Sequence, residues 1–139
     1  MMWQFLDTGF GSGEYNMAYD QKLALRMRDR RGNPTLRVYG WKPHAISIGF
    51  NQRIEDFDLS KAKLHGIDIV RRPTGGRAIL HAHELTYSVV LLHGTRSPKE
   101  VYRLANEGLF AGLSRMGIRA SFSNADDDFR KLYQDPDAL

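Results

Sequence analysis

Cysteine is absent from this chain of 139 residues. Without a thiol, no disulfide, thiolate zinc site or cysteine nucleophile can form within these residues. Long hydrophobic runs are absent too, since no stretch approaches the roughly 18 apolar residues that a membrane helix needs. The segment Met1–Phe5 shows no basic region followed by an apolar run. We therefore expect no signal peptide, no membrane association and a cytoplasmic location.

A large excess of one charge is also missing, since the formal net charge is only +4. The chain has 42% hydrophobic and 26% charged residues, which is typical of one globular domain. A charge of this size is compatible with an anionic ligand or an acidic partner, but ordinary enzymes share it. The arginines between positions 26 and 31 cluster at the end of a predicted helix, where cations suit the helix dipole. We therefore interpret these arginines as a solvated helix end and not as a nucleic-acid-binding site.

Helix-like and strand-like segments alternate along the chain, which predicts an α/β or α+β fold. Apolar spacing and a capping residue before each segment predict three helices: about 14–28, 59–64 and 98–116. In the first, Tyr15, Tyr19, Leu23 and Met27 recur every four residues, so we expect them to form its buried stripe. The third begins with Ser97-Pro98-Lys99-Glu100, which predicts a capping box.

Short alternating or apolar segments predict the strands: 3–6, 35–41, 45–50, 67–71, 78–81, 85–92 and 119–123. Residues 9–13 are predicted to be a loop. A turn at Lys42-Pro43-His44 predicts a hairpin between 35–41 and 45–50, and a second hairpin is expected between 78–81 and 85–92.

The segment Arg71–Arg77 has the sequence RRPTGGR and follows a predicted strand. Because glycine has no Cβ atom, the Gly75-Gly76 pair lets the backbone turn tightly and approach a ligand closely. Successive N–H groups in such a turn form an anion-binding concavity. The three guanidinium groups of the segment match the geometry of phosphate and carboxylate groups. We therefore predict a site for an acyl carboxyl group or a nucleotide phosphate.

The same segment is also typical of an ordinary connecting turn, because Pro-Thr-Gly-Gly suits turns and exposed arginines often flank them. The residues alone leave both interpretations open. The segment is not a P-loop, since it lacks the Gly-Lys-Ser/Thr ending, and it is not a GxGxxG fingerprint.

The run Arg71–His81, RRPTGGRAILH, followed by Glu84–Val89, ELTYSV, resembles the signature of the biotin/lipoate protein ligase superfamily. Within it, the chain is most similar to the lipoate-ligase-like octanoyltransferases of bacteria. Other parts of the chain share the resemblance: Trp3–Asp7, Asn16–Asp20, Leu36–Trp41, Ser47, Gly49 and Gln52. The resemblance extends from about residue 3 to residue 123, so we interpret 1–139 as the N-terminal part of a single catalytic domain.

The resemblance implies a mixed, largely antiparallel sheet flanked by helices, with an acyl chain beside the glycine loop. It also implies the residues that line the acyl or ATP site: Arg71, Arg72, Gly75, Gly76, Arg77, Ala78, His81, Tyr39, Trp41 and Ser47. Ligases of this family use ATP and Mg²⁺ and form an acyl-adenylate. The transferases need no cofactor and pass an acyl group from acyl carrier protein, by way of an enzyme cysteine, to a lysine of a lipoyl domain.

Two departures from the ligase pattern favour the transferase. Arg77 stands where many ligases have a third glycine, and Ala82 stands where they often have aspartate. The implied acceptors are the lipoyl domains of 2-oxoacid dehydrogenase complexes or the H protein of glycine cleavage. The family's cysteine is expected just beyond Leu139 and its lysine in a later motif. The resemblance therefore nominates no catalytic residue here, and we expect this chain to be inactive alone.

Two other hypotheses belong to different functional classes. A non-catalytic module would bind an acyl group or a lipoyl domain and would need a complementing C-terminal polypeptide for activity. A basic nucleic-acid binder ranks last, because the chain has no helix-turn-helix extension.

Other polar groups are better interpreted as ordinary structure. His81, His83 and Glu84 lack a third histidine at metal-ligand spacing, so we predict no metal site there. Asp126-Asp127-Asp128 is interpreted as a solvated acidic loop. A triad of Ser88, His81 and Asp20 is rejected, because no nucleophile elbow surrounds the serine.

Overall fold

A computed structural model describes residues 2–121 of the chain. The chain divides into two compact units, Met1–Gly94 and Thr95–Leu139, and each is considered by itself. No helix in the described range is long and apolar enough to cross a bilayer.

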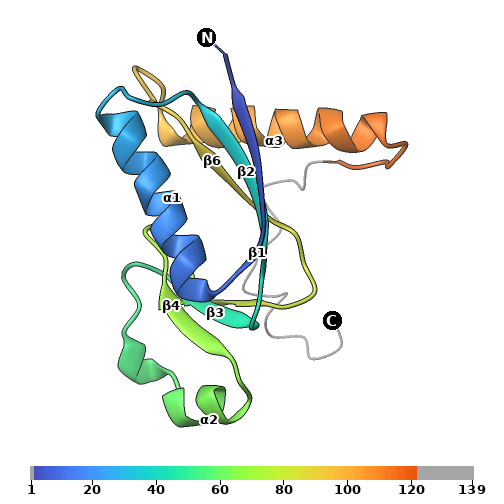
Figure 1. The fold of residues 1–139 in the computed structure, drawn as a ribbon. Helices are drawn as coiled ribbons and strands as arrows, with labels where there is room; N and C mark the ends of the chain where they lie inside the picture. The colour runs from blue at the N-terminus through green and yellow to red at the C-terminus, as the bar shows by residue number, and fades with distance from the viewer. Residues whose placement is uncertain (1, 122–139) are drawn as a thin grey trace. The chain divides into compact units, whose positions relative to one another are not determined.

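The first unit contains two three-stranded sheets with helices beside them (Figure 1). Its elements follow in chain order: β1 (Gln4–Gly11), α1 (Gly13–Arg28), β2 (Thr35–Trp41), β3 (Ala45–Ile48), a 3-10 turn (Ile54–Asp56), α2 (Leu59–Leu64), β4 (Asp68–Arg71), β5 (Ile79–His81) and β6 (Thr86–Val90). The strand orders are β1-β2-β6 and β4-β3-β5. The middle strand of each sheet is parallel to one neighbour and antiparallel to the other.

Mixed sheets flanked by helices confirm the predicted fold class, but both predicted hairpins are wrong. β2 pairs with β1 and β6, whereas β3 pairs with β4 and β5. The turn at Lys42-Pro43-His44 therefore carries the chain from one sheet to the other, and residues 82–85 carry it back. Both edges of β2 are occupied by strands distant in sequence, which a local turn signal cannot reveal. Two of the four strand pairs are parallel, so antiparallel pairing does not predominate.

β1 is longer than the sequence predicts. It runs through Gly11, where a loop over 9–13 is expected from the glycines. Its pairing with β2 shifts between Asp7 and Phe10, and Gly9 lies in the left-handed region at φ +62°. The glycines therefore produce a bulge within the strand rather than ending it.

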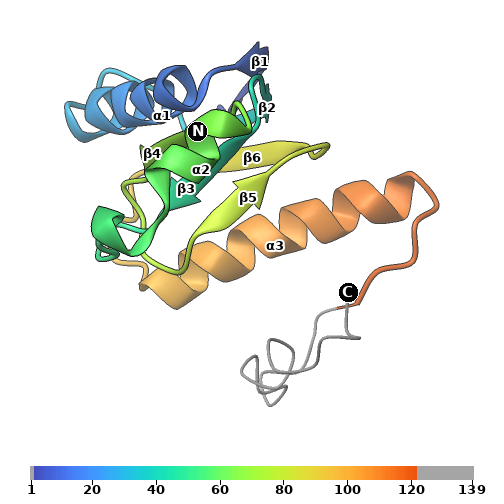
Figure 2. The same ribbon diagram turned by 90° about the horizontal axis from the view of Figure 1, so that it is seen from below.

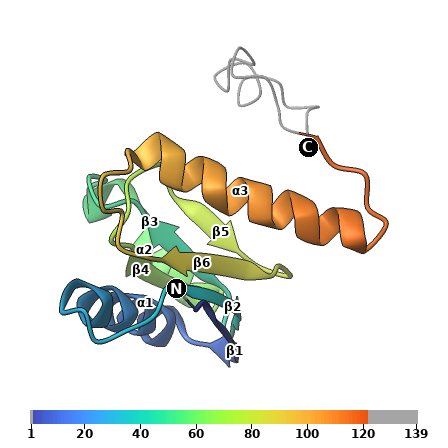
Figure 3. The ribbon, with the colours of Figure 1, turned by 90° about the horizontal axis from the view of Figure 1, so that it is seen from above.

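Helix α1 packs across both sheets, contacting β2 and β6 of one and β3 and β4 of the other. Figures 2 and 3 show it alongside β1 and β4. Its N-cap is Ser12, whose side chain accepts a hydrogen bond from the backbone of Tyr15 at 3.2 Å. The predicted stripe is only partly correct, since Met27 is buried but Tyr15 is 49% exposed. The inward face is turned instead toward Asn16, which is fully buried.

Asn16 faces inward because of Arg37 of β2, whose side chain is fully buried beneath α1. Its guanidinium bonds the carboxylate of Asp20 at 2.8 Å and the side-chain oxygen of Asn16 at 2.8 Å. The rings of Tyr19 and Tyr39 lie 4.5 and 3.8 Å from the guanidinium carbon. A buried charge is tolerated when it is paired and hydrogen-bonded in this way. This cluster attaches α1 to the β1-β2-β6 sheet.

The second unit contains the helix α3 (Pro98–Arg115). The predicted capping box is confirmed, with Ser97 and Glu100 each bonding the other's backbone. These bonds from Ser97 lower the pKa of the Glu100 carboxyl. Residues 119–121 form no strand, and the rest of the strand predicted over 119–123 lies outside the described residues, as does the acidic segment 126–128.

Candidate functional site

The glycine loop, residues 72–78 between β4 and β5, packs closely against the segment that follows β3. A Cβ atom added to Gly49 would lie 1.9 Å from the carbonyl oxygen of Gly76, so the backbones meet where only glycine fits. The backbone N–H of Phe50 also donates to the carbonyl of Thr74 at 3.0 Å. Gly76 itself has φ +92°, a region that favours glycine. The loop is therefore a packed element with a defined shape.

Arg71 holds the segment after β3 on the other side of this contact. Its Nη1 atom donates to the carbonyl oxygens of Gly49, Phe50 and Gln52, at 3.0, 2.9 and 2.7 Å. The Gln52 side chain accepts in turn from the N–H of Gly49 at 2.9 Å. Arg71 therefore fixes the surface on which the glycine loop rests.

Arg72 holds the loop from inside. Its Nη2 atom donates to the carbonyl oxygens of Gly75 at 2.9 Å and Arg77 at 2.6 Å, and Nε reaches Gly75 at 3.2 Å. Nη1 bonds both the carbonyl and the hydroxyl oxygen of Ser47, at 2.8 and 3.1 Å. Partial burial lowers the pKa of the guanidinium. The bonds of Arg71 and Arg72 go to backbone carbonyls, and they give the loop its shape.

The outward-facing donors of the loop are its backbone amides. Gly75 and Gly76 are exposed, and within residues 2–121 their N–H groups donate to no protein acceptor. Arg77 is exposed beside them, and Ala78 is half-buried where the loop enters β5. Two adjacent N–H groups without a protein acceptor in the described range offer the chemistry that an anion or a developing oxyanion needs.

His81, Ser47 and Trp41 meet behind the loop. The His81 ring is buried and stacks on the Trp41 indole, with centroids 4.0 Å apart and planes at 12°. Its Nε2 atom lies 2.7 Å from the Ser47 hydroxyl, and its Nδ1 atom lies 2.6 Å from a carboxylate oxygen of Glu84. These three predicted residues therefore gather at one place, behind Arg72.

Tyr39, the remaining predicted residue, belongs to the core. It packs with Trp41 and Ala45, and its hydroxyl donates to Asp20 at 3.0 Å. Burial raises the pKa of Tyr39, and the neighbouring Asp20 charge adds to the effect. Its polar end therefore faces the Arg37 cluster and not the glycine loop.

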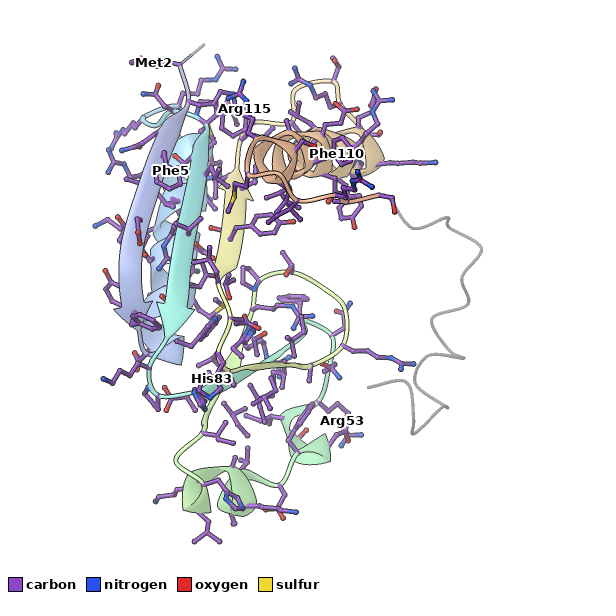
Figure 4. All side chains as sticks on the ribbon, turned by 90° about the vertical axis from the view of Figure 1, so that its right-hand side faces the viewer. Met2, Phe5, Arg53, His83, Phe110 and Arg115 are labelled. Carbon is purple, nitrogen blue, oxygen red and sulfur yellow. The ribbon has the colours of Figure 1, made fainter. Side chains whose placement is uncertain are left out.

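Sequence reasoning missed three residues that shape this site. Gly49 gives the loop room, while Glu84 and Thr86 bond the group behind it. The spacing of three residues between His81 and Glu84 is the sequence signal that could have identified this side-chain pair. These two residues pair with each other, whereas His83, in the loop that follows β5 (Figure 4), lies edge-on to His44 with ring centroids 4.9 Å apart. Within the described residues, no three His, Cys, Asp or Glu side chains are grouped for a metal.

A cavity of about 520 Å³ lies beside the loop. Its walls combine apolar groups with the two arginines: Met17, Ala18, Phe50, Val70, Pro73, Arg71 and Arg72, with Glu14 and Gln21. Cavities of roughly 300–1,000 Å³ with an apolar lining and a few polar groups are typical of small-ligand sites.

The chain is similar to known proteins. The family profile described as lipoyl protein ligase A/B catalytic domain matches residues 12–131. The chain belongs to this family. Curated relatives include octanoyltransferase LipM of Symbiobacterium thermophilum, 45% identical across 99% of this chain and 50% of the relative. LipM of Kyrpidia tusciae is 41% identical across 96% of this chain and 51% of the relative.

Solved structures of family members have the same fold. A lipoate-protein ligase A bound with ATP superposes with a TM-score of 0.76 at 29% identity, over 91% of this chain and 52% of that one. A bipartite lipoate protein ligase from Thermoplasma acidophilum, studied with its E2 lipoyl domain, gives 0.73 at 28% identity, over 89% and 49%. The predicted resemblance and fold are confirmed. The chain spans about half the length of the curated relatives it matches.

Proposed function

We propose that this chain supplies the acyl-carboxyl cradle of an enzyme that attaches an octanoyl or lipoyl group to a lysine of a lipoyl domain. One observation carries the proposal: Gly75 and Gly76 are exposed and, within residues 2–121, their N–H groups donate to no protein acceptor, while Arg72 holds the carbonyls of Gly75 and Arg77. Family membership supplies the chemistry to which such donors are suited.

In this proposal the two amides bind the oxygen of the acyl carboxyl or thioester group. Acyl transfer to an amine passes through a tetrahedral species with negative charge on that oxygen. Preorganised donors are worth about 3–4 kcal/mol of barrier each when well aligned. The cavity beside the loop offers apolar walls at Met17, Phe50 and Val70 for the acyl chain.

We favour octanoyl transfer over ATP-dependent ligation. The octanoyltransferases named above are 41% and 45% identical to the chain, whereas the solved ligases are 28% and 29% identical. Arg77 and Ala82 depart from the ligase pattern in the same direction. Transfer from acyl carrier protein needs no cofactor. A ligase would use ATP with Mg²⁺, and the Gly75 and Gly76 amides would then face a phosphate oxygen.

The acceptors in this proposal are lipoyl domains of 2-oxoacid dehydrogenase complexes or the glycine cleavage H protein, in the cytoplasm. We propose that residues 1–139 act as part of a single catalytic domain and need the segment that corresponds to the C-terminal half of the relatives. The archaeal ligase that is bipartite supports activity built from two polypeptides.

The test is complementation with the C-terminal half of the Symbiobacterium octanoyltransferase. Octanoyl transfer from acyl carrier protein to a lipoyl domain is measured by intact-protein mass. We expect no product from this chain alone and product when both polypeptides are present. Transfer by the chain alone, or no transfer by a mixture shown to associate, contradicts the proposal.

Arg72→Met in the same mixture should lower the rate at least about tenfold, because losing its bonds to the Gly75 and Arg77 carbonyls misplaces the amide donors, and loss of one such donor costs that much or more. Arg28→Met is the matched control, since the Arg28 side chain is 72% exposed at the far end of α1 and, among the described residues, bonds only Asp29. Equal rates for the two variants would remove the loop from the mechanism.

A further inference from the structure

A continuous chain of hydrogen bonds runs behind the glycine loop. Arg72 donates to the Ser47 hydroxyl at 3.1 Å, the hydroxyl lies 2.7 Å from His81 Nε2, and His81 Nδ1 lies 2.6 Å from Glu84 Oε1. Arg72 also grips the carbonyls of the loop, so this chain connects Glu84 to the loop through three intermediate side chains.

A second branch reaches the same carboxylate from the other sheet. The Trp41 indole N–H donates to the Thr86 hydroxyl at 2.7 Å, and that hydroxyl donates to Glu84 Oε1 at 2.6 Å. Trp41 and Thr86 belong to the β1-β2-β6 sheet, whereas Ser47 and His81 belong to the β4-β3-β5 sheet. Glu84 is thus the common acceptor of a network that joins the two sheets.

The directions of these bonds fix the protonation pattern of His81. A carboxylate only accepts, so the contact between His81 Nδ1 and Glu84 Oε1 requires a proton on Nδ1. In the tautomer with that single proton, Nε2 accepts from the Ser47 hydroxyl, whose oxygen accepts from Arg72. Bonds that all run toward one carboxylate strengthen one another. The network therefore favours a ring proton on Nδ1 of His81.

The order Ser47–His81–Glu84 matches a serine–histidine–acid triad, but Ser47 is not placed to attack a substrate. Ser47 is 1% exposed, and its hydroxyl oxygen already accepts from Arg72. Trp41 covers one face of the His81 ring. The group therefore acts on Arg72 and the loop, not on the acyl group.

We infer that Glu84 is a positioning residue: it holds His81 in one tautomer, and through Ser47 and Arg72 it fixes the Gly75–Gly76 amides for the acyl group. The part about the acyl group rests on the proposed function. The part about the tautomer and the loop stands on the geometry alone.

The experiment compares Glu84→Ala with Glu84→Gln and with Glu55→Ala in ¹⁵N-labelled chain. Glutamine keeps an acceptor oxygen for His81 Nδ1–H and Thr86, so it is the conservative rescue. Glu55 is the matched control, because it is an exposed glutamate whose partner Arg53 lies 3.6 Å away and is itself exposed. Three signals are recorded: the His81 ring nitrogens, the Gly75 and Gly76 amides, and octanoate binding.

We expect an Nδ1-protonated His81 in the unaltered chain, in Glu84→Gln and in Glu55→Ala. In Glu84→Ala the ring nitrogens should report a mixture of tautomers, and the two glycine amides should shift. Octanoate affinity should fall about tenfold, as loss of a hydrogen bond to a charged group predicts. A folding check by thermal unfolding accompanies each variant.

The inference is overturned if His81 carries its proton on Nε2 in the unaltered chain, or if Glu84→Ala moves neither the ring nor the glycine signals. It is also overturned if Glu84→Gln behaves like Glu84→Ala. If the tautomer and the loop respond as expected but the unaltered chain binds no octanoate, the positioning network stands and the proposed function fails.

Discussion

Two arginines, Arg37 and Arg72, have different roles in this molecule. Arg37 lies in the middle of β2, fully buried, and its partners are side chains of α1 together with two aromatic rings. Arg72 lies just after β4, less buried, and most of its partners are backbone carbonyls. The first arginine joins a helix to a sheet. The second shapes a single loop.

The comparison shows that an arginine next to a glycine pair need not be the group that binds an anion. Because a trans peptide group directs its N–H opposite to its C=O, the bond from Arg72 to the Gly75 carbonyl turns the Gly76 N–H away from the guanidinium. Gly75 and Gly76 are exposed, and within residues 2–121 their N–H groups have no protein acceptor, whereas Arg72 is bonded to carbonyls. The buried Arg37 cluster has no such outward donors, and its role is stability.

Replacing Arg37 should have the largest effect on stability. Arg37→Met leaves Asp20 without its cation and Asn16 without a partner at 2.8 Å, in the interface beneath α1. Breaking a buried pair by removing one partner costs about 3–5 kcal/mol of unfolding free energy. Urea unfolding measures this change, and Arg28→Met should alter the same free energy by less than about 0.5 kcal/mol. Similar losses for the two variants would contradict the assignment of Arg37 to the core.

A smaller effect is expected at the contact between Gly49 and the glycine loop. In Gly49→Ala the new methyl group would meet the Gly76 carbonyl, so the loop must move. Overpacking of this kind costs about 1–3 kcal/mol of unfolding free energy, and the Gly75 and Gly76 amide signals should shift with it. Gly75→Ala is the stability control, because a Cβ atom there meets nothing within 4 Å and φ is not positive. If Gly49→Ala leaves the loop signals in place, the close packing is not what shapes the loop.

Local features of the fold were predictable from the sequence. Ser12, Asp58 and Ser97 cap the three helices as expected, because a cap needs only residues within one turn. Strand pairing was not predictable, because the partners of β2 are distant in sequence. The paired residues of β1 lie 30 or more positions earlier (40 − 10 = 30), and those of β6 lie 47 or more positions later (86 − 39 = 47). The turn at Pro43 predicts a hairpin between β2 and β3, but β1 and β6 occupy both edges of β2.

In the candidate site, too, local features were predictable from the sequence and contacts between distant segments were not. The residues of the glycine loop were identified by their motif, yet the direction of each guanidinium depends on carbonyls that arrive from Ser47 and the segment after β3. The buried polar face of α1 was missed for a related reason. Helical spacing favours apolar residues such as Tyr15, whereas Asn16 is drawn inward by an arginine on another strand.

The central claim is that the Gly75 and Gly76 amides receive the acyl carboxyl group. Titration of ¹⁵N-labelled chain with octanoate, followed by amide chemical shifts, tests it most directly. The account predicts saturable shifts centred on Gly75 and Gly76, reduced in Arg72→Met and unchanged in Arg28→Met. Saturable octanoate binding that leaves both glycine amides unmoved would contradict it.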